Sequence, residues 1–173
     1  MDLRSKIRTV MHFPKQGIGF KDITTLLLDA EALRMSVDEM AAPFKGKGIT
    51  KIVGIESRGF IFGMPMAYSM KLPFVPIRKP GKLPAQKASE CYELEYGKDT
   101  IEVHCDAISK GDRVLLVDDL LATGGTMGAA VNLVRKLGGE VTGISFLIEL
   151  DFLKGRERLK GISVNSLVHY DGE

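Results

Sequence analysis

The sequence predicts an α/β fold in which helices flank a central parallel β-sheet. Apolar, β-branched runs of strand length alternate along the chain with segments whose apolar residues recur at helical spacing. Such alternation is typical of parallel sheets, because each helix carries the chain back to begin the next strand in the same direction. The 173 residues can bury one substantial core, and no repeat, linker or low-complexity tract divides them. We therefore predict a single domain over residues 1–173.

Composition excludes several classes of protein. Lys and Arg number 24 against 22 Asp and Glu, a balance that argues against a nucleic-acid binder that relies on bulk charge. No apolar run approaches the ~20 residues of a membrane span, and the charged, amphipathic N-terminus does not resemble a signal peptide. Cys91 and Cys105 form no C-x-x-C pair, so we expect a reducing, cytoplasmic location and neither a metal centre nor a disulfide framework. The histidines share no metal-ligand spacing and are interpreted as structural: His12, His104 and His169.

The N-terminal segment is predicted to be a helix followed by a loop. Apolar residues between positions 2 and 11 share one helical face, which predicts a short amphipathic helix over 2–11. Proline and glycines then mark a loop over 12–20. Phe20 at the end of this loop would, taken alone, be a core anchor.

The next part of the chain predicts two strand–helix alternations. A helix is expected over about 30–45, with Asp29 as its N-cap. A strand over 52–55 leads into a helix that opens at Glu56 and runs to about Met70. Pro65 falls inside this helical window, and we expect it in the first turns or at a kink. Residues 73–77 form the next predicted strand.

A basic loop and a hairpin follow. Residues 78–84 contain three cations, two prolines and a glycine, so this loop cannot be helical and is expected to stay mobile until an anion binds. A run of charge is usually a solvated surface, but this one follows a strand, at the sheet edge where open α/β folds bind ligands. Residues 85–91 are predicted to be a flexible lid. Residues 92–96 and 100–104 alternate in polarity around a turn at 97–99, which predicts a β-hairpin.

The stretch from Arg113 to Thr126 carries the most information. A buried parallel strand is expected to end at Asp118 and Asp119, followed by a small-residue turn over 122–126. A helix then runs from Met127 to Leu137 and is stopped by two glycines. This arrangement aims backbone N–H groups and the positive end of a helix at one point, which is an anion site.

The two carboxylates narrow the choice of anion. Neither a Walker A loop nor a G-x-G-x-x-G fingerprint is present. Because carboxylates repel phosphate, Asp118 and Asp119 must face sugar hydroxyls, a metal ion or a developing positive charge. A 5-phosphorylated ribose with an ionising C1 satisfies all three conditions. The alternative is a pair of solvated aspartates at a strand corner. The remaining chain predicts a strand over 141–150, a short amphipathic helix over 153–159 and a strand over 162–168.

Residues 114–126 resemble the phosphoribosyl diphosphate (PRPP) motif of the type I phosphoribosyltransferase family, and the resemblance to its adenine-specific branch extends over nearly the whole chain. It implies the type I phosphoribosyltransferase fold, with an N-terminal hood (residues 1–28) that contributes to the base site. It also implies a flexible catalytic loop and a β-hairpin arm over residues 79–105. Gln16 departs from the pattern, since many relatives have proline there.

The resemblance also implies roles for individual residues. The 5-phosphate would be bound by Ala122, Thr123, Gly124, Gly125 and Thr126. The diphosphate would be bound by Ser57, Arg58, Arg78, Lys79 and Lys82. Adenine would be bound by Ile18, Phe20 and Lys21. The catalytic residues would be Glu95, Asp118, Asp119 and Arg58.

The activity implied is transfer of the 5-phosphoribosyl group from PRPP to adenine, which gives AMP and diphosphate in purine salvage. Mg²⁺ would be bound through PRPP and diphosphate, with no direct protein ligand expected. No nucleic-acid or membrane partner is expected, and family members are usually homodimers. Two alternatives stay open: the same fold acting on another purine, and a PRPP-sensing regulator without turnover.

Overall fold

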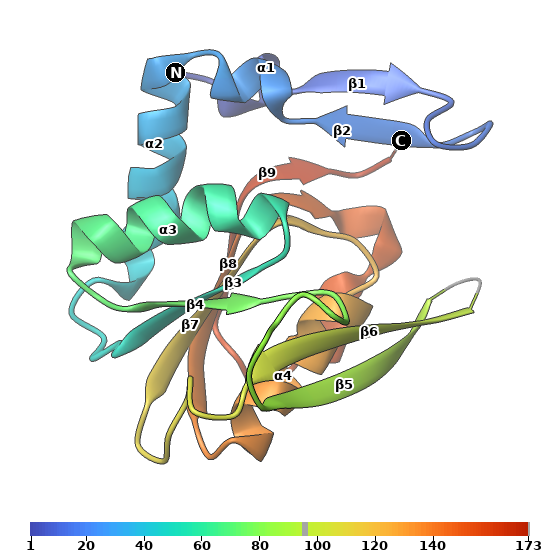
Figure 1. Cartoon of the computed structure of the whole chain (residues 1–173). Coiled ribbons are helices and arrows are strands. Elements are labelled where there is room, and N and C mark those ends of the chain that lie inside the picture. The colour runs from blue at the N-terminus through green and yellow to red at the C-terminus, as the bar shows by residue number, and fades with distance from the viewer. Residues whose placement is uncertain (95–96, 173) are drawn as a thin grey trace.

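A computed structural model describes residues 1–94 and 97–172 and contains the predicted parallel sheet (Figure 1). Five strands lie in the order β4-β3-β7-β8-β9, and every neighbouring pair is parallel. Their bounds are β3 Lys51–Ile55, β4 Phe74–Ile77, β7 Arg113–Leu121, β8 Glu140–Leu150 and β9 Val164–Tyr170. The prediction of a central parallel sheet is confirmed.

Both faces of the sheet are covered. Helices α2 (Ala30–Ala41) and α3 (Arg58–Met70) pack on one face, and α4 (Gly125–Lys136) packs on the other. Strand β7 contributes alternate side chains to the two cores: Leu115 and Val117 join the cluster under α2 and α3, while Val114 and Leu116 join the cluster under α4. A strand buried on both faces must be apolar throughout, which explains the unbroken hydrophobic run.

Details of α2 and α3 refine the predictions. Asp29 is the N-cap of α2, and its side chain accepts hydrogen bonds from the N–H groups of Glu31 and Ala32, as predicted. The helical segment ends in a short 3₁₀ helix, η2 (Ala42–Phe44). Helix α3 starts at Arg58, two residues later than expected, and Pro65 lies in its interior. Pro65 thus lies beyond the first turn of α3. The other alternative, a kink at this proline, stays a prediction.

The hood differs from its predicted helix. A 3₁₀ helix η1 (Leu3–Lys6) precedes an antiparallel pair of strands, β1 (Arg8–Met11) and β2 (Gly19–Asp22), and the hood ends in α1 (Thr24–Leu27). The helical prediction is wrong beyond Lys6. Leu3 and Ile7 are buried as a helical face requires, but Met11 is 52% exposed, and the backbone from Arg8 onward pairs with β2.

The arm is longer than predicted and turns elsewhere. Strands β5 (Lys87–Leu94) and β6 (Gly97–His104) are antiparallel partners along their full lengths. Residues 87–91 are therefore strand rather than lid, and Gly97–Asp99 belongs to β6 rather than to a turn. Buried Ala88, Ile101 and Val103 pack in the same core as α4, which fixes the ribbon against the sheet. The connection between the strands falls on residues 95–96, outside the described residues.

The C-terminal segment forms two 3₁₀ helices, η3 (Asp151–Leu153) and η4 (Gly155–Leu159), in place of the predicted α-helix. Lys154 between them has φ 52°, which interrupts the helical path. The last strand starts two residues later than predicted. Within the described residues, no helix has the length and apolar character needed to cross a membrane.

The strand order places a topological switch point between β3 and β7. From β3 the chain moves outward to β4, whereas from β7 it moves the other way to β8 and β9. In open parallel sheets, ligands bind beyond the carboxyl ends of the strands at such a point. Two predicted site segments follow these two strands: residues 56–58 after β3 and residues 122–126 after β7.

Candidate active site

A cavity of about 440 Å³ opens at the switch point. Most of its lining comes from the ends of β3 and β7 and from the segments that follow them. The lining residues predicted from the sequence are Phe20, Ser57, Arg58, Lys79, Asp118, Asp119, Ala122, Thr123, Gly124, Gly125 and Thr126. The structure therefore brings together candidates for all the predicted binding functions.

The two aspartates lie inside β7 rather than after it. Strand β3 ends at Ile55, but β8 continues alongside β7, and Asp118 and Leu121 still pair with Phe146 and Glu149. Pairing on one side only leaves the β3 side of β7 open at the level of the acids. The prediction that the strand ends at the two aspartates is therefore wrong, because β7 continues to Leu121. Its pairing with β8 holds both carboxylates on a hydrogen-bonded backbone at the cavity.

The phosphate turn, residues 122–126, leads directly into α4. Gly124 is the N-cap of α4 with φ 80°, and Gly125 and Thr126 already belong to the first helical turn. The first N–H groups of a helix have no intrahelical acceptor, and those of α4 lie at the cavity. Together with the positive end of the helix dipole they form an anion site.

The acid pair is strongly perturbed, with Asp119 buried and Asp118 partly buried. Asp118 Oδ1 accepts a hydrogen bond from the Asp119 N–H at 2.9 Å, and Asp119 is only 3% exposed. Burial raises the pKa of Asp118 well above its ordinary value, and repulsion from Asp119 adds to this. Burial also raises the pKa of Asp119, although Arg58 opposes that shift. Perturbed acids of this kind concentrate at functional sites.

One oxygen of Asp119 is buried without a hydrogen bond from the described residues. Its Oδ2 lies 3.0 Å from Arg58 Nε, close enough for an ion pair. The two groups are not aligned for a hydrogen bond, and Oδ2 accepts none from any residue that the structure describes. A buried acceptor in this state costs free energy until a donor arrives, so it favours a ligand that carries hydroxyl groups.

Arg58 joins the acids to the hood. Its guanidinium carbon is 5.1 Å from the centroid of the Phe20 ring, while its Nε faces Asp119. Phe20 also packs against Phe13, with the two rings edge-to-face at 5.2 Å between centroids. An aromatic face and a planar cation thus lie at the mouth of the cavity, beside the acids. The neighbouring peptide bond, Glu56–Ser57, is cis.

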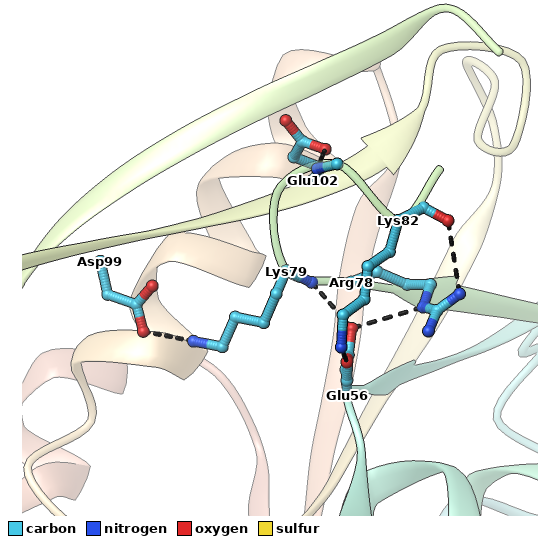
Figure 2. A network of polar contacts seen from close by, with 7 residues as sticks. Glu56, Arg78, Lys79, Lys82, Asp99 and Glu102 are labelled. Atoms are coloured by element: carbon cyan, nitrogen blue, oxygen red, sulfur yellow. Dashed lines mark hydrogen bonds and ion pairs between the residues drawn. The ribbon is translucent and has the colours of Figure 1, made fainter. Parts of the chain in front are cut away.

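The basic loop (residues 78–84) is held by a carboxylate that the sequence analysis did not single out. Glu56, at the end of β3, accepts hydrogen bonds from the Lys79 N–H at 2.8 Å, from Arg78 Nε at 3.3 Å and from Lys82 Nζ (Figure 2). Although burial opposes the shift, the bonds from Lys82 and Lys79 lower the pKa of Glu56. Glu56 is therefore ionised at neutral pH and acts as the counter-ion of the loop.

Lys79 has a separate partner on the arm. Its Nζ bonds to the Asp99 carboxylate (Figure 2). The same Nζ lies 3.1 Å from the Tyr92 hydroxyl. The Tyr92 hydroxyl in turn donates to Asp99 at 3.0 Å. The basic loop and the arm are thus connected through the Lys79–Asp99 ion pair and through a backbone β-bridge between Arg78 and Glu102.

Some predicted residues lie away from the cavity wall. Arg78 and Lys82 do not line the cavity, and both pair with Glu56. Ile18 is 39% exposed in the hood, and its N–H and carbonyl join the local turn with Lys15 and Phe13. Lys21 is buried, with its Nζ 4.3 Å from the centroid of the Tyr170 ring. Glu95 lies outside the described residues, so its position is not assigned.

The sequence analysis missed several cavity residues. Glu56 carries the same signal as Asp118, a carboxylate at the end of a buried strand. The apolar lining residues give no such signal, because each is part of an ordinary hydrophobic run: Ile55, Leu120, Leu121, Met127 and Phe146.

Known proteins resemble this chain over its whole length. The phosphoribosyl transferase domain family matches residues 24–163. An adenine phosphoribosyltransferase of Clostridium perfringens is 59% identical over 171 residues, which are 99% of each chain. The crystal structure of adenine phosphoribosyltransferase from Thermoanaerobacter pseudethanolicus has a TM-score of 0.94 at 50% identity, and the match covers 97% of this chain and 98% of that one. The enzyme from Giardia lamblia, complexed with 9-deazaadenine, has a TM-score of 0.91 at 40% identity, over 98% of this chain and 96% of that one.

Proposed function

Since the chain belongs to the adenine phosphoribosyltransferase family, we infer that it transfers the 5-phosphoribosyl group of PRPP to adenine, giving AMP and diphosphate in purine salvage. The observation that carries this is the joining of an acid pair, a phosphate turn and an aromatic hood around one cavity. The direct test is incubation with PRPP, Mg²⁺ and a set of free bases, with nucleotide product as the readout. Absence of AMP would refute the assignment. PRPP binding without AMP would instead indicate a PRPP sensor.

We propose that the phosphate turn and the acid pair hold the phosphoribosyl group from two ends. The N–H groups of the turn, with the Thr123 and Thr126 hydroxyls, bind the 5-phosphate. Asp119 Oδ2, which accepts no hydrogen bond from the described residues, and the Asp118 carboxylate accept from the ribose hydroxyls. This requires both acids to be ionised when PRPP is bound. As the bond from C1 to diphosphate breaks, the same carboxylates stabilise the positive charge on the sugar.

Diphosphate leaves toward the cations at the ends of β3 and β4. Ser57, Arg58 and Lys79 already line the cavity. The charges of Arg58 and Lys79 stabilise the departing anion, and the Ser57 hydroxyl can donate a hydrogen bond to it. Arg78 and Lys82 can add to this only if they exchange Glu56 for diphosphate. No covalent enzyme intermediate is required, so catalysis rests on positioning and electrostatics.

Glu56 gives a test of that exchange. We expect Glu56→Gln to bind diphosphate roughly 3- to 10-fold more tightly, because the neutral amide no longer competes for Arg78 and Lys82 with a charge-assisted hydrogen bond. Isothermal titration calorimetry with diphosphate and Mg²⁺ measures this, with Glu157→Gln as a matched surface control. Weaker binding by Glu56→Gln would instead assign Glu56 to holding the basic loop in its binding conformation.

Enzymes of this family use the magnesium complex of PRPP. The site suits such a complex, because Asp118 and Asp119 offer hard carboxylate oxygens, and Asp119 Oδ2 accepts no hydrogen bond from the described residues. We propose that Mg²⁺ arrives on the substrate oxygens and neutralises part of the charge on diphosphate. The two aspartates face it without forming a protein cage.

The base stacks on Phe20, in our proposal, and is read by the hood backbone between Ile18 and Lys21. Buried Lys21 is directed to Tyr170 and Thr9, which supports its pointing away from the base. Strand β8, Glu140–Leu150, contains no lysine that could donate to a 6-oxo group. Glu95 stays a prediction as the proton shuttle for adenine. The single domain over 1–173 and the homodimer likewise stay predictions.

The proposed base site is expected to prefer adenine over 6-oxopurines. We expect kcat/KM for adenine to exceed that for hypoxanthine or guanine by at least about 10-fold, because an unpaired buried hydrogen-bonding group costs roughly 1–3 kcal/mol. Initial rates with each base at saturating PRPP measure the ratio. If either 6-oxopurine matched adenine, the base assignment would be wrong while phosphoribosyl transfer would stand.

A further inference from the structure

The back of the phosphate turn packs against a segment that is distant in sequence. Gly155, the first residue of η4, is buried and its backbone touches the turn: a Cβ on Gly155 would lie 2.1 Å from the Ala122 carbonyl oxygen and 3.0 Å from the Gly124 nitrogen. Conversely, a Cβ on Gly124 would lie 2.5 Å from the Gly155 carbonyl oxygen. The two backbones therefore fit together with no room for a side chain.

The residue after Gly155 anchors this contact to the sheet. Arg156 donates from Nε to Glu149 Oε1 at 2.9 Å and from Nη2 to Oε2, and its Nη1 donates to the Val164 carbonyl at 3.0 Å. Ser166 adds a hydrogen bond to Glu149 Oε2 at 2.6 Å. A bidentate pair of this kind fixes orientation as well as distance.

The anchor is itself rigidly placed beside the turn. Glu149 is 5% exposed, and its backbone pairs with Leu121, the residue before the turn begins. Although burial opposes the shift, hydrogen bonds from Arg156 and Ser166 lower the pKa of Glu149. The carboxylate is thus ionised at neutral pH and stays paired.

We propose that Glu149 and Arg156 are positioning residues for the 5-phosphate site. They hold Gly155 against the back of the phosphate turn. The N–H groups of the turn therefore stay directed at the cavity. Neither side chain touches the substrate in this assignment. The proposal rests on the proposed function, because it takes residues 122–126 as the 5-phosphate site.

This role predicts a particular split among the ligands. PRPP and AMP both carry the 5-phosphate, whereas diphosphate and adenine do not. A loosened turn weakens 5-phosphate binding equally in the ground state and the transition state, so KM for PRPP rises while kcat is nearly kept. A general loss of folded protein would instead lower the active fraction for every ligand alike.

The test uses the full chain with Glu149→Gln and Arg156→Lys, and Glu157→Gln as an exposed control in the same segment. We expect KM for PRPP and Kd for AMP to rise roughly 10- to 100-fold in the first two variants, in the range expected for a misplaced binding group. Calorimetric Kd values for diphosphate and the KM for adenine should stay within about 2-fold of wild type. Glu157→Gln should match wild type throughout.

Two outcomes would overturn the proposal. One is an unchanged Kd for AMP in both variants, with wild-type protein active in the same assay. The other is an equal loss of AMP and diphosphate binding in Arg156→Lys samples that melt cooperatively, which would mean that the pair supports the whole site and not the phosphate turn in particular. Failure of the wild-type protein to make AMP would refute the proposed function instead, so the two failures are distinguishable.

Discussion

Replacing Asp119 by asparagine is expected to lower kcat by about 10- to 1,000-fold while the fold stays intact, the range found when one electrostatic contact to a transition state is lost. Asparagine preserves the shape of the side chain but removes the negative charge beside the sugar. Because the charge grows on the ribose only during reaction, the loss should appear in kcat more than in KM for PRPP. Steady-state rates measure it, with Asp38→Asn on the surface of α2 as a control.

The pH profile gives Asp119 a second test. Burial raises its pKa above the ordinary value of 3.8, and activity requires the ionised form. Activity of the wild type should therefore fall at a higher pH than an ordinary aspartate would allow, as acid protonates the carboxylates. The Asn variant has no carboxylate at position 119 to titrate. A variant with wild-type turnover and the wild-type profile would remove Asp119 from the mechanism.

Gly124→Val is expected to weaken PRPP binding by more than about 100-fold. Gly124 has φ 80°, a conformation that valine avoids, and the new Cβ would meet the Gly155 carbonyl at 2.5 Å. Because the Gly155 neighbour is backbone, the turn itself must move. Its N–H groups then no longer point at the phosphate. The clash thus comes from the Gly155 backbone behind the turn.

Calorimetric titration with PRPP measures this loss, and the chain offers a matched control. Gly128 lies one turn further along α4, and a Cβ there would meet nothing within 4 Å. Gly128→Ala should therefore bind PRPP as the wild type does. Undiminished PRPP affinity in Gly124→Val, with Gly128→Ala also unchanged, would place the 5-phosphate site elsewhere.

The sequence predicted what is encoded locally. The strand–turn–helix from Arg113 to Lys136, the Asp29 cap and the parallel sheet follow from periodicity and capping residues over short stretches. Strand β1 could not be predicted this way, because Arg8–Met11 is a strand only through pairing with Gly19–Asp22. Local periodicity reports the burial of Leu3 and Ile7 but not the partner of the backbone.

The site was predictable to the same extent. Motif residues at the ends of β3 and β7 converge because parallel strands end at one edge of the sheet. The counter-ions Glu56 and Glu149 were not singled out, because each pairs with cations that only the fold brings near. The place of Gly155 behind the turn likewise depends on a contact across about 30 residues, which no local pattern contains.

The pairing of the basic loop with Glu56 and Asp99 also bears on how fast PRPP arrives. Cations that are already neutralised project little field beyond the Debye length, about 8 Å at physiological salt. Electrostatic steering accelerates encounter when a cleft presents unbalanced charge of one sign. Here Arg58 is paired with Asp119 and Lys79 with Asp99, while Arg78 and Lys82 share Glu56. These cations therefore act on the bound anion and attract PRPP only weakly from a distance. The association rate constant for PRPP should depend only weakly on ionic strength.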